Sequence, residues 1–314
     1  MLADALRALF SGAFGSWYAF GSGTLVRATP LILTGLAVAI AFRAGVFNIG
    51  AEGQFLVGAV AQAAVALTVH ALPAFVLFPA TLVAGAIAGA AWAWIAAVLR
   101  SRFHVLEVIS TIMLNFVALY LVSYLVRGPL QEPTHIYPQT SSIVDAARLP
   151  RFGATTRLHL GFAIAVIACV AAWWAIKYTA AGFRLRAVGA NPFAARSAGL
   201  IDAERTATRA FLLSGAFAGL AGAIEVAGVT YALYENISPG YGFTAIAVAL
   251  LARLNPLAVI LTGIAFGALE SGAAAMQRDA GVPSVVVSVI EAIIILALVA
   301  FDRLRTRQLA QARA

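Results

Sequence analysis

The run PAFVLFPATLVAGAIAGAAWAWIAAVL, residues 73–99, carries no charged side chain and is longer than a bilayer crossing requires. A helix needs about 20 apolar residues to cross a hydrocarbon core of ~30 Å. Comparable runs lie near 24–42, 49–69, 104–126, 159–177, 206–227, 255–276 and 284–301. Another run, near 240–253, is short for a straight crossing, which predicts a broken helix or one whose ends are buried in protein. The sequence therefore predicts an all-α polytopic membrane protein of about nine spans, with residues 1–314 forming one domain.

Composition supports the same class, because 62% of the residues are hydrophobic and 11% are charged. A soluble core of 314 residues cannot hide that much apolar surface. The net charge of +8 is explained by cationic residues at cytoplasmic helix ends. We therefore predict a lipid membrane, and no nucleic acid, as the partner of this basic chain.

The distribution of Lys and Arg predicts the orientation of the spans. Alternation places Arg43, the turn RSRFH, the segment from Lys177 to Arg209 and the C-terminus in the cytoplasm. Nine spans then place the N-terminus outside. The opening stretch is expected either to lie on the outer surface as an amphipathic piece or to follow a helix that this sequence lacks.

Small residues recur at spacings of three and four in two predicted spans, which lets helices approach closely. They are Gly215, Gly219 and Gly222 in one span, and Gly263, Gly267 and Ser271 in the other. The single cysteine, Cys169, lies in an apolar run and is interpreted as a packing residue.

Ionisable and polar residues inside spans carry more information, because a charge in hydrocarbon is costly unless it is paired or hydrated. Five glutamates fall in or at the ends of spans: Glu52, Glu107, Glu225, Glu270 and Glu291. Glu107, Thr111 and Asn115 recur every four residues, so one polar stripe is expected to face the bundle interior. Such groups either line a route for a polar solute or fix helix register, and the residues alone leave both possibilities open. His104 and Glu107 lack further ligands, so no metal site is predicted.

Enzymatic activity is not predicted. Lys177 is the only lysine, so the chain cannot contain a phosphate-binding loop of the G-x-x-x-x-G-K-[ST] type. The sequence also shows no grouping of Ser, His and Asp and no H-E-x-x-H motif.

Residues 182–200, GFRLRAVGANPFAARSAGL, form a basic stretch within a predicted cytoplasmic segment at 178–205. Asn191 can cap a helix, Pro192 suits its first turn, and Gly199 can end it. A helix of about eight residues is unstable alone in water, so it is expected to rest on its own bundle or on a partner protein.

This stretch resembles the ATPase-coupling segment of ABC importer permeases of the simple-sugar, nucleoside and branched-chain amino-acid group. Residues 42–59, 110–130 and 240–272 resemble the corresponding parts of that group, and FNIGAEGQ looks closest to nucleoside permeases. The resemblance implies about ten spans in usual members, two permease subunits, and two ATPase domains, often fused, that bind ATP and Mg. It also implies a solute-binding lipoprotein and a location in the bacterial inner membrane. The chain itself is expected to need no cofactor.

The expected function is therefore translocation of a small polar solute, most specifically a nucleoside. A simple sugar such as a pentose is the alternative, and an ion-coupled secondary transporter is the alternative of another class. The residues that match the coupling motif are Gly182, Arg184, Arg186, Ala187, Gly189, Asn191, Pro192, Ala195, Arg196 and Gly199. A bulky acidic replacement at Gly189 or Ala195 is expected to abolish uptake while leaving membrane insertion intact.

The candidate pathway residues are Asn48, Glu52, Gln54, Asn115, Glu225 and Glu270. Asn48 and Gln54 flank IGAEG, where glycines permit a break in helical hydrogen bonding. The loop 127–158 is expected to be an external surface that receives the solute receptor. On the same face, Tyr231, Tyr234, Glu235 and Asn236 can meet a receptor or a sugar-like ligand.

Overall fold

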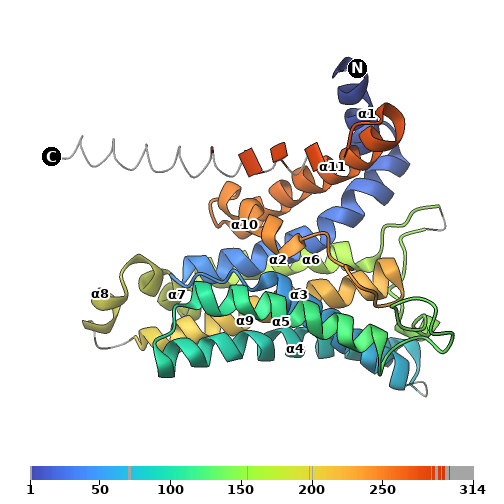
Figure 1. The fold of residues 1–314 in the computed structure, drawn as a ribbon. Coiled ribbons are helices and arrows are strands. Elements are labelled where there is room, and N and C mark those ends of the chain that lie inside the picture. The colour runs from blue at the N-terminus through green and yellow to red at the C-terminus, as the bar shows by residue number, and fades with distance from the viewer. Residues whose placement is uncertain are drawn as a thin grey trace.

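The computed structural model describes residues 2–69, 72–153, 155–197, 199 and 201–283, and positions 285, 286, 289, 290, 292, 293 and 297. Over that part of the chain the fold is all-helical, which confirms the predicted class (Figure 1). Seven helices among the described residues are long and apolar enough to cross a membrane. Most of the span predicted near 284–301, including Glu291, lies outside the described residues, as does the C-terminal tail.

Each of the seven long helices corresponds to a predicted span. They are α2 (Leu25–Arg43) with the preceding π-helical turn η1 (Ala19–Thr24), α3 (Ala51–Thr68), α4 (Ala74–Phe103), α5 (Glu107–Arg127), α6 (Leu160–Tyr178), α9 (Ala203–Glu225) with the following π-helical turn η3 (Val226–Thr230), and α11 (Pro256–Ala280). The shorter elements are α1 (Leu2–Phe14), the 3-10 turn η2 (Asp145–Ala147), α7 (Ala180–Ala190), α8 (Pro192–Ser197) and α10 (Tyr241–Leu251).

Side-chain caps and left-handed residues set several of the helix ends. The Asn255 side chain accepts a hydrogen bond from Leu257 N at 3.1 Å, and Pro256 begins α11. His104 ends α4 with a φ of 54°, and Gly281 ends α11 with a φ of 66°. The helices α4 and α11 therefore end a few residues beyond the predicted spans.

The core lies where α3, α4 and α9 meet at small residues. A Cβ placed on Gly215 would lie 2.5 Å from the carbonyl oxygen of Gly89, and one on Gly85 would lie 3.0 Å from that of Gly58. Ser271 of α11 donates a hydrogen bond of 3.0 Å to the carbonyl oxygen of Gly12. These contacts confirm that the small residues serve close helix packing. Cys169 is fully buried in the same core, which confirms its role as a packing residue.

The opening helix α1 packs along α11, where Ala5 and Ala8 meet Ala273 and Met276. The opposite side of α1 is apolar and exposed, since Phe10 is 65% exposed. Figure 1 shows α1 beside α11, away from α7 and α8. The helix is therefore a packed part of the fold as well as an amphipathic piece.

Candidate functional site

A non-helical segment, residues 44–50, enters the bundle between the end of α2 and the start of α3. Its Val46 packs against Ala93, Ala97 and Phe211 of α4 and α9, and Asn48 has no exposed surface. Backbone groups buried without partners are costly, so this segment needs hydrogen bonds from side chains.

Three predicted pathway residues form a hydrogen-bond network around this segment, and two of them, Asn48 and Asn115, bond its backbone. The Asn48 and Gln54 amides bond each other at 2.9 and 3.0 Å, and Asn48 also donates to the Ser214 hydroxyl at 2.8 Å. Asn115 accepts from Gly53 N at 2.8 Å and donates to the Ile49 carbonyl oxygen at 2.9 Å. The structure brings Asn48, Gln54 and Asn115 together around the non-helical segment 44–50, and none of them lines the large cavity described below.

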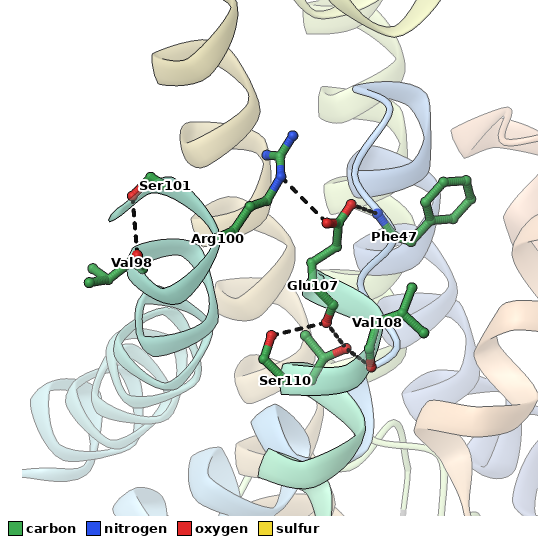
Figure 2. Close-up of polar contacts among 8 residues, drawn as sticks. Phe47, Val98, Arg100, Ser101, Glu107, Val108 and Ser110 are labelled. Carbon is green, nitrogen blue, oxygen red and sulfur yellow. Dashed lines mark hydrogen bonds and ion pairs between the residues drawn. The ribbon is translucent and has the colours of Figure 1, made fainter. Parts of the chain in front are cut away.

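The predicted stripe on α5 faces this segment. Thr111 and Asn115 are 1% and 4% exposed, which confirms that the stripe points into the bundle. At its end, the Glu107 carboxylate lies 3.5 Å from Arg100 Nε of α4 and accepts from Phe47 N at 3.5 Å, as Figure 2 shows. Glu107 thus connects α4 and α5 to the non-helical segment 44–50.

A cavity of about 700 Å³ lies where the end of α9, the start of α10 and the second half of α11 meet. The polar and aromatic residues that line it include Arg27, Glu225, Tyr234, Asn236, Tyr241 and Glu270. The structure therefore brings Glu225 and Glu270 together at one cavity, apart from the other four predicted pathway residues. Carboxylates bind hydroxyl and amino groups, and aromatic rings pack against flat apolar faces, so the lining suits a small polar ligand.

Two of these residues, Arg27 and Tyr241, were not predicted. Arg27 is the single charge within the run 24–42, and an isolated charge inside a span is a signal that could have identified it. Glu225 directly precedes η3 and Arg27 follows η1. Both charged residues therefore stand beside π-helical turns, which are frequent at functional sites.

At the end of the bundle that is predicted to face outside, the segment 231–236 is bound to the predicted external loop. Arg127 Nε and Nη2 donate to the two carboxylate oxygens of Glu235 at 2.7 Å each, and the Ser123 hydroxyl donates to the same carboxylate. These hydrogen bonds lower the pKa of Glu235 to about 2. Glu235 therefore binds the end of α5, where this loop begins, and does not line the cavity.

Tyr231 provides the second attachment of the loop. Arg151 Nη2 donates to the Tyr231 hydroxyl at 2.8 Å, and the guanidinium of Arg148 lies 4.8 Å from the ring centroid. Backbone hydrogen bonds of 2.8 Å join Ile143 N to the Tyr231 carbonyl and Thr140 N to the Leu233 carbonyl. Tyr231 thus fixes the loop beside the chain segment that leads to the cavity.

At the opposite end of the bundle, the predicted coupling segment forms two helices, α7 and α8 (Figure 1). The Thr179 hydroxyl caps α7 by accepting from Gly182 N at 3.1 Å. The Asn191 side chain caps α8, accepting from Phe193 N and Ala194 N at 3.0 Å each, as the sequence predicts. Gly199 has a φ of 72°, a conformation suited to glycine, although α8 ends earlier, at Ser197.

The residues predicted for coupling divide by exposure. Gly182 and Ala195 are buried, Ala187 is half-buried, and the polar members Arg184, Arg186, Asn191 and Arg196 are exposed together with Pro192 and Gly189. Phe193 is 77% exposed at the start of α8 and was not predicted. Its only sequence signal is an aromatic residue beside a helix cap, which does not reveal exposure. The exposed set forms a basic surface with one aromatic side chain, and we call it the coupling surface.

Comparisons with known proteins find a family and several relatives that match most of the chain. A family model described as branched-chain amino acid transport system / permease component matches residues 21–299. The chain is 44% identical over 285 residues to the glucose ABC transporter permease protein TsgB13 of Haloferax volcanii, covering 88% of this chain and 74% of that one.

Two further relatives are named for a different class of solute. The chain is 42% identical over 299 residues to the guanosine ABC transporter permease protein NupP of Bacillus subtilis, covering 94% of this chain and 85% of that one. It is 33% identical over 300 residues to the nucleoside ABC transporter permease protein NupB of Lactococcus lactis, covering 91% and 80%. No solved structure matches the chain.

Proposed function

Because this chain belongs to the family of branched-chain amino acid transport permease components, we propose that it translocates a nucleoside through the membrane in an ATP-driven importer. The chain is the non-catalytic, multi-pass membrane subunit of an ABC transporter, and ATP hydrolysis belongs to a partner ATPase. Family membership favours this function over that of an ion-coupled secondary transporter.

The observation that carries the proposal is the cavity of about 700 Å³ at Glu225 and Glu270. Its two carboxylates can accept hydrogen bonds from the hydroxyls of a ribose, and Tyr234 or Tyr241 can pack against a base. A charge-neutral solute with many hydroxyl and amino groups fits such a lining better than an apolar solute does. The relatives named for guanosine and nucleosides support the same class.

A simple sugar is the second candidate, because one strongly similar relative is named for glucose. A sugar would use the same carboxylates and would leave the aromatic rings with a smaller role. The two solutes are therefore distinguished by the aromatic residues of the cavity.

Coupling to ATP is proposed to pass through the coupling surface on α7 and α8. Arg184, Arg186 and Arg196 can donate charge-assisted hydrogen bonds to carboxylates of the ATPase, and Phe193 offers an apolar anchor. ATP and Mg are bound by that ATPase, which we expect to be a fused double domain. A second permease subunit would complete the pathway, and a solute-binding lipoprotein would dock at the loop 127–158. In this arrangement the C-terminus of the chain is cytoplasmic, in a bacterial inner membrane.

The test is uptake of radiolabelled guanosine, ribose and glucose by cells that express the permease with its ATPase and receptor. We expect guanosine uptake that stops when ATP is depleted and continues when a protonophore collapses the ion gradients. Glu225→Gln and Glu270→Gln are expected to lower uptake, with Cys169→Ala, a change in a packing residue, as the control. Uptake that collapses with the protonophore while ATP is intact would contradict the proposal, and uptake of sugars alone would select the second candidate.

A further inference from the structure

Two helices begin at the same place inside the bundle and not at its surface. The helix α3 has 18 residues and α10 has 11. At 1.5 Å per residue, α10 is about 16 Å long, roughly half of a ~30 Å crossing. Each is preceded by non-helical chain, residues 44–50 before α3 and 231–240 before α10.

The N-termini of these two helices are in direct contact. Gly242, in the first turn of α10, lies so close to α3 that an added Cβ would overlap the backbone of Ala51 and Glu52. The Glu52 carboxylate accepts a hydrogen bond from Gly242 N at 2.7 Å, and Ser238 lies near the same carboxylate. The Ser238 hydroxyl accepts from Gly240 N and Tyr241 N at 3.1 Å each.

Electrostatics explains why a carboxylate stands at this position. The N-terminus of a helix carries partial positive charge and unpaired N–H groups, so two N-termini that meet repel each other. A buried acid at the junction offsets this repulsion and satisfies one of the unpaired donors. Glu52 is 8% exposed and does not line the cavity, so its position fits this role better than contact with solute.

Glu52 also lies between the coupling segment and the wall of the cavity. On one side, the segment 44–50 leads back to Arg43, whose carbonyl oxygen would lie 1.9 Å from a Cβ on Gly189 of the coupling segment. On the other side, the first turn of α10 places Tyr241 and Thr244 in the cavity wall. The segment between them is held by Asn48, Asn115 and Glu107 through the contacts described above, so it can move as a unit.

We propose that Glu52 is a positioning residue that locks the first turn of α10 to the first turn of α3, and thereby transmits movement of the coupling segment to the cavity wall. This inference rests on the proposed function. It assigns Glu52 to the link between ATP-driven movement and the pathway, and it predicts that Glu52 does not bind the solute.

The experiment follows the accessibility of the cavity wall in the purified complex with its ATPase, reconstituted in nanodiscs. Thr244→Cys in a Cys169→Ala background is labelled with a maleimide, without nucleotide and with ATP plus vanadate. The unsubstituted Glu52 protein is expected to show a nucleotide-dependent labelling rate. In Glu52→Ala this difference should fall to about a tenth or less, because a hydrogen bond to a charged group is lost. ATP hydrolysis should continue without uptake.

Two conservative variants distinguish the effect of the length of the Glu52 side chain from the effect of its charge. The side chain of Glu52→Gln still reaches Gly242 N but carries no charge, so it should retain part of the labelling difference, whereas Glu52→Asp is too short and should lose it. If Glu52→Ala does not fold, this pair decides the question. The control is Thr34→Val, which removes a buried hydroxyl that bonds its own helix. It should leave labelling unchanged.

Each outcome bears on one of the two proposals. A nucleotide-dependent difference that persists in Glu52→Ala, or equal behaviour of the Asp and Gln variants, overturns the role of Glu52 while transport by the unsubstituted protein stands. A loss confined to solute affinity, with labelling intact, makes Glu52 a solute ligand and also overturns it. Absence of ATP-dependent uptake in the unsubstituted complex would instead refute the proposed function.

Discussion

Replacing Gly189 by alanine tests whether the coupling segment is fixed to the bundle by backbone contact. A Cβ on Gly189 would lie 1.9 Å from the carbonyl oxygen of Arg43 and 2.9 Å from its carbonyl carbon. Carbon–oxygen contacts between packed backbones normally lie near ~3.3 Å, so α7 must move by about 1.4 Å. Overpacking of this kind typically costs about 1–3 kcal/mol.

The displacement should reach the ATPase, because α7 runs into α8 through Asn191. If the same 1–3 kcal/mol opposes the docked position of α8, affinity for the ATPase should fall about 5- to 150-fold. Gly189 contacts Arg43, and Ala195 is 6% exposed and packs with Val188 and Ala203. Both residues therefore act through contacts within this chain and not through contact with the ATPase. The structure thus supplies a different reason for the loss of uptake expected from acidic replacements at these positions.

The assay compares binding of the purified ATPase to Gly189→Ala and to the unsubstituted permease in detergent, followed by solute uptake in reconstituted vesicles. The matched control is Gly21→Ala, because a Cβ on Gly21 would meet no atom within 4 Å. The control should stay within about 0.5 kcal/mol of the unsubstituted protein in stability. Full ATPase binding and full uptake by Gly189→Ala would refute the reasoning.

Three further predictions address docking, packing and pH. Phe193→Ala should leave stability within about 0.5 kcal/mol, because this side chain is 77% exposed, yet weaken ATPase binding in a pull-down; unchanged binding would remove Phe193 from the coupling surface. Gly222→Ala places a Cβ 1.9 Å from the Phe55 carbonyl oxygen and should destabilise the detergent-solubilised protein by about 1–3 kcal/mol, which an unaltered melting temperature would contradict. Burial, aided by neighbouring arginines, lowers the pKa of His159 from 6.5 to about 4. Between pH 6.5 and 4, His159 therefore binds a proton in the unfolded chain but stays neutral in the folded protein. About 3 kcal/mol of the free energy of unfolding is present above pH 6.5 and is lost as the pH falls toward 4. His159→Asn can still cap α6 and should flatten this acid sensitivity in thermal melts; an equally steep loss in that variant would exclude His159 as its cause.

The sequence by itself determined the features that depend on local pattern. Runs of apolar residues located the membrane-crossing helices, because crossing lipid requires length and hydrophobicity that any window of sequence displays. The caps at Asn191 and Pro192 located α8 in the same way. The four-residue period of Glu107, Thr111 and Asn115 correctly placed a polar face toward the interior. The run near 240–253 was too short to cross, and α10 is indeed short.

The tertiary structure decided what each polar residue meets. The sequence groups Asn48, Gln54 and Asn115 with Glu225 and Glu270 because all are polar residues in or beside spans. In the structure the first three hold the non-helical segment 44–50, whereas the two glutamates line the cavity. Glu52 bonds Gly242, 190 positions away in the chain, and no period or window records such a contact. Hydropathy and helical periodicity describe one segment at a time, whereas the meeting of two helix N-termini depends on how the segments pack against each other.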